Sequence, residues 1–202
     1  MDFLNRDNLE PIYTDIKITK LNGEKVLRVV KADKIMKFDE NTYAKVRKLS
    51  FHNGVIEVKM LSRLLPDAPD FARGFIGIAY RINEDDTQFE SFYVRPTNGR
   101  QCIDPVRKTH GCQYFSYPQY TFAYFREHQI TDYEAPVDID LNEWIDLKAI
   151  IEDKHAQFYI NNQLVLEVHD MKHGANARGS IGLFVDIGTE AYFKDLRVTF
   201  ND

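Results

Sequence analysis

Apolar and polar residues alternate along several short runs of this chain, which is the pattern of strands with one buried face. In the run GVIEVKMLS (Gly54–Ser62), Ile56 and Met60 are apolar members of one face, and Glu57 and Lys59 belong to the other. The same criterion predicts further strands over Ile16–Lys20, Glu24–Lys31, Gly74–Ile82, Glu90–Arg95, Glu143–Glu152, Ala156–Ile160, Leu164–His169, Ser180–Asp186 and Ala191–Phe200.

The connections between these runs are short and carry turn residues. Asn22-Gly23 and Asn161-Asn162 each predict a hairpin, because Asn and Gly tolerate positive φ. A convincing helical period is absent from the sequence apart from one short turn predicted near Asn41–Arg47. About ten strands without crossover helices predict an all-β fold, an antiparallel two-sheet β-sandwich of jelly-roll type.

One long segment, Arg95–Glu134, interrupts the strand pattern. It contains both cysteines, five of the eleven tyrosines, four arginines and two histidines. Binding groups commonly lie on long connections that a rigid scaffold holds in place. We therefore predict that residues 95–134 form the functional site.

Length and composition limit the class of protein. The 202 residues suit one all-β domain, and no linker or repeat divides residues 1–202. A net charge of −5 argues against a nucleic-acid partner. No apolar run approaches the roughly 20 residues needed to cross a bilayer, so membrane insertion is not expected. The N-terminus lacks a signal-peptide pattern, which predicts a cytoplasmic protein, or a secreted or periplasmic one if a leader was removed. The oligomeric state is not indicated.

The cysteines allow two interpretations. Cys102 and Cys112 lie ten positions apart, a spacing compatible with a bridge in an oxidising compartment. The interpretation we favour is a pair of free, partly buried thiols. With only His110 nearby and no C-x-x-C pair, no metal site is predicted here.

Four stretches of the C-terminal half resemble a known family pattern. They are EWIDLK (Glu143–Lys148), AQFYIN (Ala156–Asn161), GSIGLF (Gly179–Phe184) and YFKDLRV (Tyr192–Val198), with FHNGVIEVKM (Phe51–Met60) as a further match. They look like strands of the concanavalin A-like lectin/glucanase superfamily, in its laminin-G-like and 3-keto-disaccharide-hydrolase-like branches.

The resemblance implies a jelly roll of two curved sheets, whose concave sheet and rim loops commonly bind or cleave carbohydrate. A fold shared by lectins, hydrolases and adhesion modules does not name a function by itself. The E-x-D-x-x-E strand of laminarinase-type glucanases is missing, which puts that retaining mechanism in doubt. The laminin-G calcium ligands cannot be matched residue by residue either.

The segment 95–134 offers the two kinds of group that sugar recognition uses. Aromatic rings supply flat apolar faces, and planar polar groups bind hydroxyls. The ligand-binding candidates are Arg95, Asn98, Arg100, Arg107, Gln113, Tyr114, Tyr117, Tyr120 and Arg126. The turn dipeptide Asn98-Gly99 is expected to bring Arg95 and Arg100 close together. Because Arg donates through a rigid fork that fits carboxylates, the ligand is expected to be a carbohydrate, with an acidic one as a further option.

A structural interpretation competes at each of these positions. Aromatic residues of a β-sandwich are usually core, as expected for Tyr93, Phe115 and Phe125. The arginines could instead pair with Asp104, Glu127, Asp132 and Glu134 and so order the segment.

For catalysis, Asp104, His110 and Glu134 are the best acid or base candidates, although a lone histidine in a polar loop is more often only a hydrogen-bonding residue. No cofactor is expected. Asp170, Asp186 and Glu190 could help to bind calcium, but acidic hairpin turns are commonly only solvated. Three functions stay open: a carbohydrate-binding lectin-like domain with its site on the concave sheet, a glycoside hydrolase-like enzyme, and a structural or adhesion domain.

Overall fold

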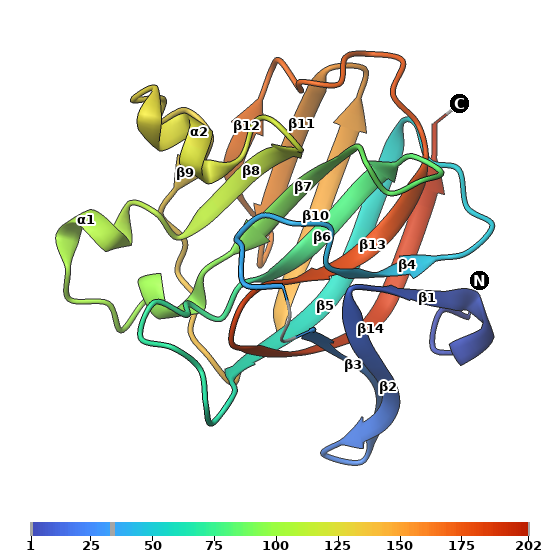
Figure 1. The fold of residues 1–202 in the computed structure, drawn as a ribbon, viewed down its shortest axis with the longest axis horizontal. Coiled ribbons are helices and arrows are strands. Elements are labelled where there is room, and N and C mark those ends of the chain that lie inside the picture. The colour runs from blue at the N-terminus through green and yellow to red at the C-terminus, as the bar shows by residue number, and fades with distance from the viewer. Residues whose placement is uncertain (1, 33–34, 202) are drawn as a thin grey trace.

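The chain folds into two antiparallel sheets of seven strands each, which pack face to face (Figure 1). The computed structural model describes residues 2–32 and 35–201. Sheet A has the order β1 (Leu9–Ile12), β4 (Tyr43–Val46), β13 (Ser180–Val185), β6 (Ile76–Ile82), β7 (Phe89–Val94), β8 (Cys112–Tyr117) and β9 (Glu134–Ala135). Sheet B has the order β12 (Gln163–Val168), β11 (His155–Ile160), β10 (Ile145–Glu152), β5 (Gly54–Leu64), β14 (Thr189–Phe200), β3 (Glu24–Lys31) and β2 (Thr14–Leu21).

The predicted fold class is confirmed, and so is each strand predicted from alternation. Asn22 and Gly23 have positive φ in the β2–β3 hairpin, as do Asn161 and Asn162 between β11 and β12. The helical turn predicted near Asn41–Arg47 is wrong, because residues 43–46 form β4 between β1 and β13. Tyr43, Ala44 and Val46 are all buried there, so the apolar residues of this run face both sides of a strand rather than one side of a helix.

The two sheets differ in how they are buried. Sheet B alternates, since β10 and β11 bury every second side chain and leave nearly all of the others partly buried. Its inner face packs on sheet A, where the rings of Phe92 and Phe158 stack with their centroids 4.2 Å apart. In sheet A, every residue of β6, β7 and β13 is buried. Both faces of sheet A are therefore covered.

Aromatic side chains fill the outer face of sheet A. Tyr93, Phe115 and Phe184 come from three strands and contact one another at centroid distances of 5.6 to 5.8 Å. Asp39, which precedes β4, is anchored beside this sheet: its side chain accepts a hydrogen bond from the backbone N–H of Phe122, and its own N–H donates to Asp186. As expected, Tyr93, Phe115 and Phe125 are core residues.

The segment 95–134 is more regular than a single long connection. It contains a short 3-10 turn (Pro96–Asn98), α1 (Pro105–Lys108), β8 and α2 (Phe122–Glu127). β8 pairs with β7 over its whole length, so the middle of the segment belongs to the sheet. Both helices lie at one side of the sandwich (Figure 1).

The two cysteines are free and buried, which confirms the favoured interpretation. Burial raises the pKa of the Cys112 thiol to about 12. Over residues 2–32 and 35–201, none of the helices is long and apolar enough to span a bilayer.

Candidate functional site

A pocket of about 310 Å³ opens between α1, α2 and the end of β7. Its apolar wall is made by Phe38, Phe71, Phe75, Tyr93, Val106 and Phe122, and its polar lining by Arg73, Arg95, Asn98, Arg107, His110 and Arg126. Larger hollows of about 700 and 580 Å³ lie beside β4. We take the smaller pocket as the candidate site because aromatic walls and buried polar groups converge on it.

The end of β7 determines where the pocket forms. β7 stops at Val94, and the next residue, Arg95, leads into the turn at Pro96, whose fixed φ suits the start of a short helix. Asp104 caps α1 by accepting hydrogen bonds from the N–H groups of Val106 and Arg107. This cap fixes the start of α1. Arg107 then links α1 to the turn, because its Nε donates to Oδ1 of Asn98 at 3.0 Å.

Arg95 is the buried polar centre of the site. It donates to Oε2 of Glu134 at 3.1 Å, to the hydroxyl of Tyr93 at 2.9 Å and to Oε1 of Gln113 at 2.6 Å. Burial lowers the pKa of Arg95, but the neighbouring Tyr93 and Glu134 outweigh that effect and raise it overall. The guanidinium is thus permanently charged and held in one orientation.

Glu134 joins three cationic or proton-binding groups. Besides Arg95, it accepts two hydrogen bonds of 3.1 Å from Arg126, and its Oε2 lies 2.6 Å from Nδ1 of His110. Burial raises the pKa of Glu134, yet the Arg126 hydrogen bonds and the positive charges around it hold that pKa below its usual value. Burial also lowers the pKa of His110. Glu134 acts to raise that pKa, and the charges of Arg126 and Arg95 lower it further. These effects together favour the neutral imidazole of His110.

Positive charge exceeds negative charge around the pocket. Arg73 donates to the backbone carbonyls of Asp70 and Ala72, and Arg107 donates to Asn98 and Thr97. Among the residues that the structure describes, neither Arg73 nor Arg107 forms an ion pair with a carboxylate. Burial, and then the nearby Arg107, lowers the pKa of Arg73. The arrangement leaves two guanidiniums available to an anion.

A second buried acid lies behind the aromatic wall. Asp39 is completely buried, and in the described part of the chain its Oδ1 has no hydrogen-bond partner. Burial, together with the charge of nearby Asp186, raises the pKa of Asp39 to about 7. Asp186 itself is paired with Lys31, at 2.8 Å between Oδ1 and Nζ.

The structure brings some of the predicted residues together and separates others. Those that line the pocket are Arg95, Asn98, Arg107, His110 and Arg126. Glu134 and Gln113 support Arg95 from behind. Arg100 was expected to lie close to Arg95. It instead forms exposed ion pairs with Asp138 and Glu143.

The predicted tyrosines lie outside the pocket. Tyr114 is fully buried and donates from its hydroxyl to Glu90 at 2.5 Å. Tyr117 donates to Glu40 at 3.1 Å, and Tyr120 packs on Tyr124. β8 contains Tyr114 and Tyr117, so strand alternation and not loop geometry sets the directions of these two side chains.

Part of the pocket lining was not predicted from the sequence. Phe38, Phe71, Arg73 and Phe75 line the pocket, and all four lie outside the segment 95–134. The stretch FARGF (Phe71–Phe75) follows Pro66 and Pro69 between two strands. Aromatic residues and an arginine in a proline-containing connection between strands could have indicated that this stretch lines a binding site.

The three acids considered for calcium do not converge. Asp170 contacts Tyr133 and Lys172, Asp186 contacts Lys31, and Glu190 contacts Arg28. Each already has a cationic partner.

The architecture defines the class first: an all-β, antiparallel two-sheet sandwich of jelly-roll type. The chain belongs to the family of 3-keto-alpha-glucoside-1,2-lyase-like domains, whose model matches residues 56–199. No curated protein sequence matches the chain.

Solved structures support the same class at the level of fold. The carbohydrate-binding module CBM66 from Bacillus subtilis is 16% identical, with a TM-score of 0.63 over 94% of this chain and 93% of that one. A protein of unknown function with a galectin-like fold, also from Bacillus subtilis, is 12% identical, with a TM-score of 0.57 over 95% and 89% of the two chains. A putative glycosyl hydrolase from Parabacteroides distasonis is 14% identical, with a TM-score of 0.54 over 95% and 98%.

Proposed function

We propose that this protein binds a carbohydrate that carries an anionic group, in the pocket between α1 and α2. The observation that carries the proposal is the convergence of four arginines on one aromatic-walled pocket: Arg73, Arg95, Arg107 and Arg126. A guanidinium donates two parallel hydrogen bonds to a carboxylate, which selects for anionic groups by geometry as well as by charge.

The aromatic wall suits the rest of a sugar. The rings of Phe71 and Phe122 contact Phe38 edge-on at 5.4 Å, which builds a continuous apolar surface. Phe71 remains 45% exposed, so its ring is accessible to a ligand in the pocket. The C–H face of a pyranose ring is a suitable cover.

Two of the four pocket arginines pair with a carboxylate and two do not, and this difference favours ligand binding over a purely structural role. Glu134 forms ion pairs with both Arg95 and Arg126, as in a structural network. Arg73 and Arg107 are held by carbonyl and amide oxygens and, within the described residues, by no carboxylate. A domain that only needed to be stable would gain nothing from crowding these charges together. We therefore assign Arg73 and Arg107 to the anionic group of the ligand and Asn98 and His110 to its hydroxyls.

The comparisons point in the same direction. One structural neighbour is a carbohydrate-binding module, and the family takes its description from an activity on a glucoside. These likenesses support carbohydrate as the ligand class, and the arginines add the preference for acidic sugars.

Titration calorimetry with short oligosaccharides tests the proposal. Oligosaccharides that contain uronic acid are expected to bind with one site per chain, and their neutral counterparts more weakly. The variant Arg107→Gln is expected to lose binding, whereas Arg100→Gln is the matched control, since Arg100 is an exposed arginine of the same segment outside the pocket. Absence of binding to both acidic and neutral sugars by the folded protein would overturn the proposal in favour of a structural or adhesion domain.

A second candidate function is favoured by the contact between His110 and Glu134. Elimination from a 3-keto glucoside moves the C2 proton to a base while the C1–O bond breaks and a C1–C2 double bond forms. The lowered pKa of His110 favours the neutral form that a base requires, and its Nδ1 lies 2.6 Å from Oε2 of Glu134. The arginines would stabilise the negative charge that develops on the keto oxygen. Asp104, which caps α1, has no role in this scheme.

Turnover separates the two candidates. If the protein is a lyase, incubation with a 3-keto glucoside releases the aglycone, and His110→Ala abolishes that release while Arg100→Gln does not. Saturable binding without release assigns the site to recognition alone.

A further inference from the structure

The hairpin formed by β11 and β12 presents two imidazoles and a carboxylate on one surface, far from the residues of the pocket in the sequence. Gln157 pairs with Glu167 across the two strands, and Ala156 pairs with Val168. Ala156 and Val168 are buried. Since side chains alternate, residues 155, 157, 167 and 169 all point away from the core.

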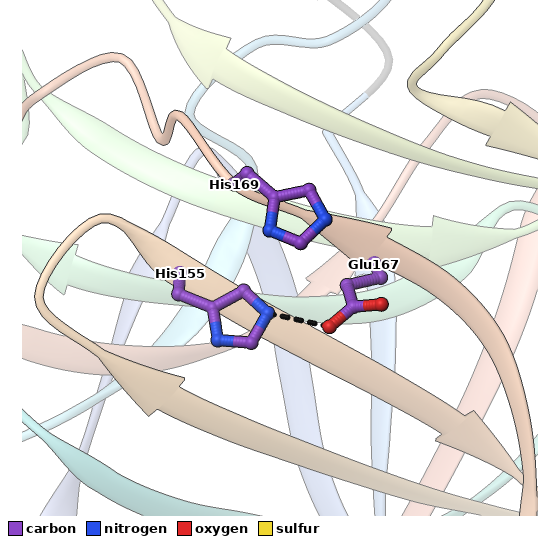
Figure 2. Close-up of side chains that lie close together, drawn as sticks. All are labelled: His155, Glu167 and His169. Atoms are coloured by element: carbon purple, nitrogen blue, oxygen red, sulfur yellow. Dashed lines mark hydrogen bonds and ion pairs between the residues drawn. The ribbon is translucent and has the colours of Figure 1, made fainter.

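His155, Glu167 and His169 converge on this surface (Figure 2). Nε2 of His155 lies 2.7 Å from Oε1 of Glu167, and the two imidazole rings are parallel within 4° at a centroid distance of 5.0 Å. One ligand atom of each residue lies within 4.8 Å of those of the other two.

We propose that His155, Glu167 and His169 bind a divalent transition-metal ion such as Zn²⁺. Zn²⁺ binds nitrogen and carboxylate oxygen at about 2.0 to 2.2 Å in tetrahedral geometry, which sets the ligand atoms about 3.3 Å apart. Two protein imidazoles and one carboxylate, with water as the fourth ligand, are a known zinc-binding combination. Imidazole ligands select Zn²⁺, Ni²⁺, Cu²⁺ and Co²⁺ over Mg²⁺ and Ca²⁺, which prefer oxygen.

The surroundings favour this geometry. The strands are already hydrogen-bonded, so the Cα atoms of the three residues are fixed before a metal binds, and only side-chain rotation has to close the site. Gln157 donates through Nε2 to Oε1 of Glu167 at 3.1 Å, which orients the carboxylate as an outer-shell partner does in metal sites. β12 is the edge strand of sheet B. A metal bound here would link β11 to that edge strand.

Titration with ZnCl₂ tests this site, and the protein must carry no polyhistidine tag. The intact chain is expected to bind one equivalent of Zn²⁺ and to melt at a higher temperature with Zn²⁺ than with EDTA. His155→Ala and His169→Ala are each expected to weaken binding at least tenfold. His128→Ala is the matched control, because His128 is an exposed histidine that follows α2 and its loss should leave the affinity unchanged.

A spectroscopic readout distinguishes metal coordination from a general effect on the fold. Co²⁺ in the tetrahedral site is expected to give visible absorption bands that His169→Ala removes, while Mg²⁺ and Ca²⁺ compete with neither metal. Equal Zn²⁺ binding by the intact chain and by the His155→Ala/His169→Ala double variant would overturn the proposal, as would failure of the intact chain to bind one equivalent.

Discussion

Arg95 and Glu134 lie 39 residues apart in the sequence and meet in a buried ion pair, with 3.1 Å between Nη1 and Oε2. Their side chains are only 6% and 4% exposed. The two residues are the ends of the segment that the sequence singled out, so the pair closes that segment around β8. It also fixes the guanidinium of Arg95 at the base of the pocket.

The first prediction concerns this pair. Glu134→Gln is expected to lower the free energy of unfolding by about 3 to 5 kcal/mol, because removal of one partner leaves a buried charge uncompensated. Urea denaturation of the two proteins measures the difference.

Asp138→Asn serves as the control for that measurement. Asp138 pairs with Arg100 on the surface and its side chain is 76% exposed. Loss of such a pair costs about 0 to 1 kcal/mol. Similar losses in the two variants would contradict a structural role for the buried pair.

The second prediction concerns pH. The pKa of Asp39 is raised to about 7 in the folded protein from 3.8, chiefly by burial. Between these values the folded state holds a proton that the unfolded state has released, so stability falls as pH rises through this window. Asp39→Asn is expected to remove this contribution, which has a slope of up to about 1.4 kcal/mol per pH unit.

Thermal denaturation of the wild-type protein and Asp39→Asn from pH 4 to pH 8 measures the difference between the two curves. Glu134 acts in the opposite direction: its lowered pKa gives stability that is lost only as pH falls below its usual value of 4.5. Parallel curves for the two proteins would show that Asp39 is ionised throughout this range.

The fold was largely predictable because alternation is a local property. Runs such as Gly54–Ser62 carry the period of a strand within a few residues, and Asn22-Gly23 marks a turn by its own chemistry. β4 was missed because it is short and buried on both faces, so it shows no alternation. Only the neighbouring strands β1 and β13, far away in the sequence, make it a strand.

The site was predictable only in part, for the same reason. Arg95, Asn98, Arg107 and Arg126 belong to one segment, and its composition revealed them. Local composition cannot show that Phe71 and Arg73, from the connection between β5 and β6, complete the same pocket. Local composition also cannot show that the side chain of Tyr114, in β8, points into the core.

Tyr114 provides the third prediction. Its hydroxyl donates to Glu90 at 2.5 Å and accepts from the N–H of Lys172 at 2.9 Å, all within the core. Tyr114→Phe is expected to lower stability by about 1.5 to 3 kcal/mol, because the buried carboxylate of Glu90 loses a donor. Ligand affinity should not change, since the residue does not line the pocket.

Tyr120→Phe is the matched control for Tyr114→Phe. Over the described residues, the Tyr120 hydroxyl has no hydrogen bond to protein, and its partly buried ring packs against Tyr124. The free energy of unfolding of Tyr120→Phe is expected to stay within about 0.5 kcal/mol of that of the wild type. A large change in sugar binding by Tyr114→Phe alone would instead make the sheet core part of the site.

The last prediction concerns the charge selectivity of the pocket. Arg107→Gln is expected to weaken binding of a uronic-acid oligosaccharide by at least tenfold, since a hydrogen bond to a charged group contributes about 1.5 to 3 kcal/mol. Arg107→Lys keeps the charge but loses the two-pronged donor, so its affinity should fall between those of Arg107→Gln and the wild type.

The wild-type affinity should also weaken as salt is raised, because the guanidinium of Arg107 is only half-buried and its attraction to an anion is screened. Calorimetry at low and high ionic strength measures both effects, with Arg100→Gln expected to match the wild type. An affinity insensitive to salt and to Arg107→Gln would mean that the ligand is recognised through its hydroxyls and the aromatic wall alone.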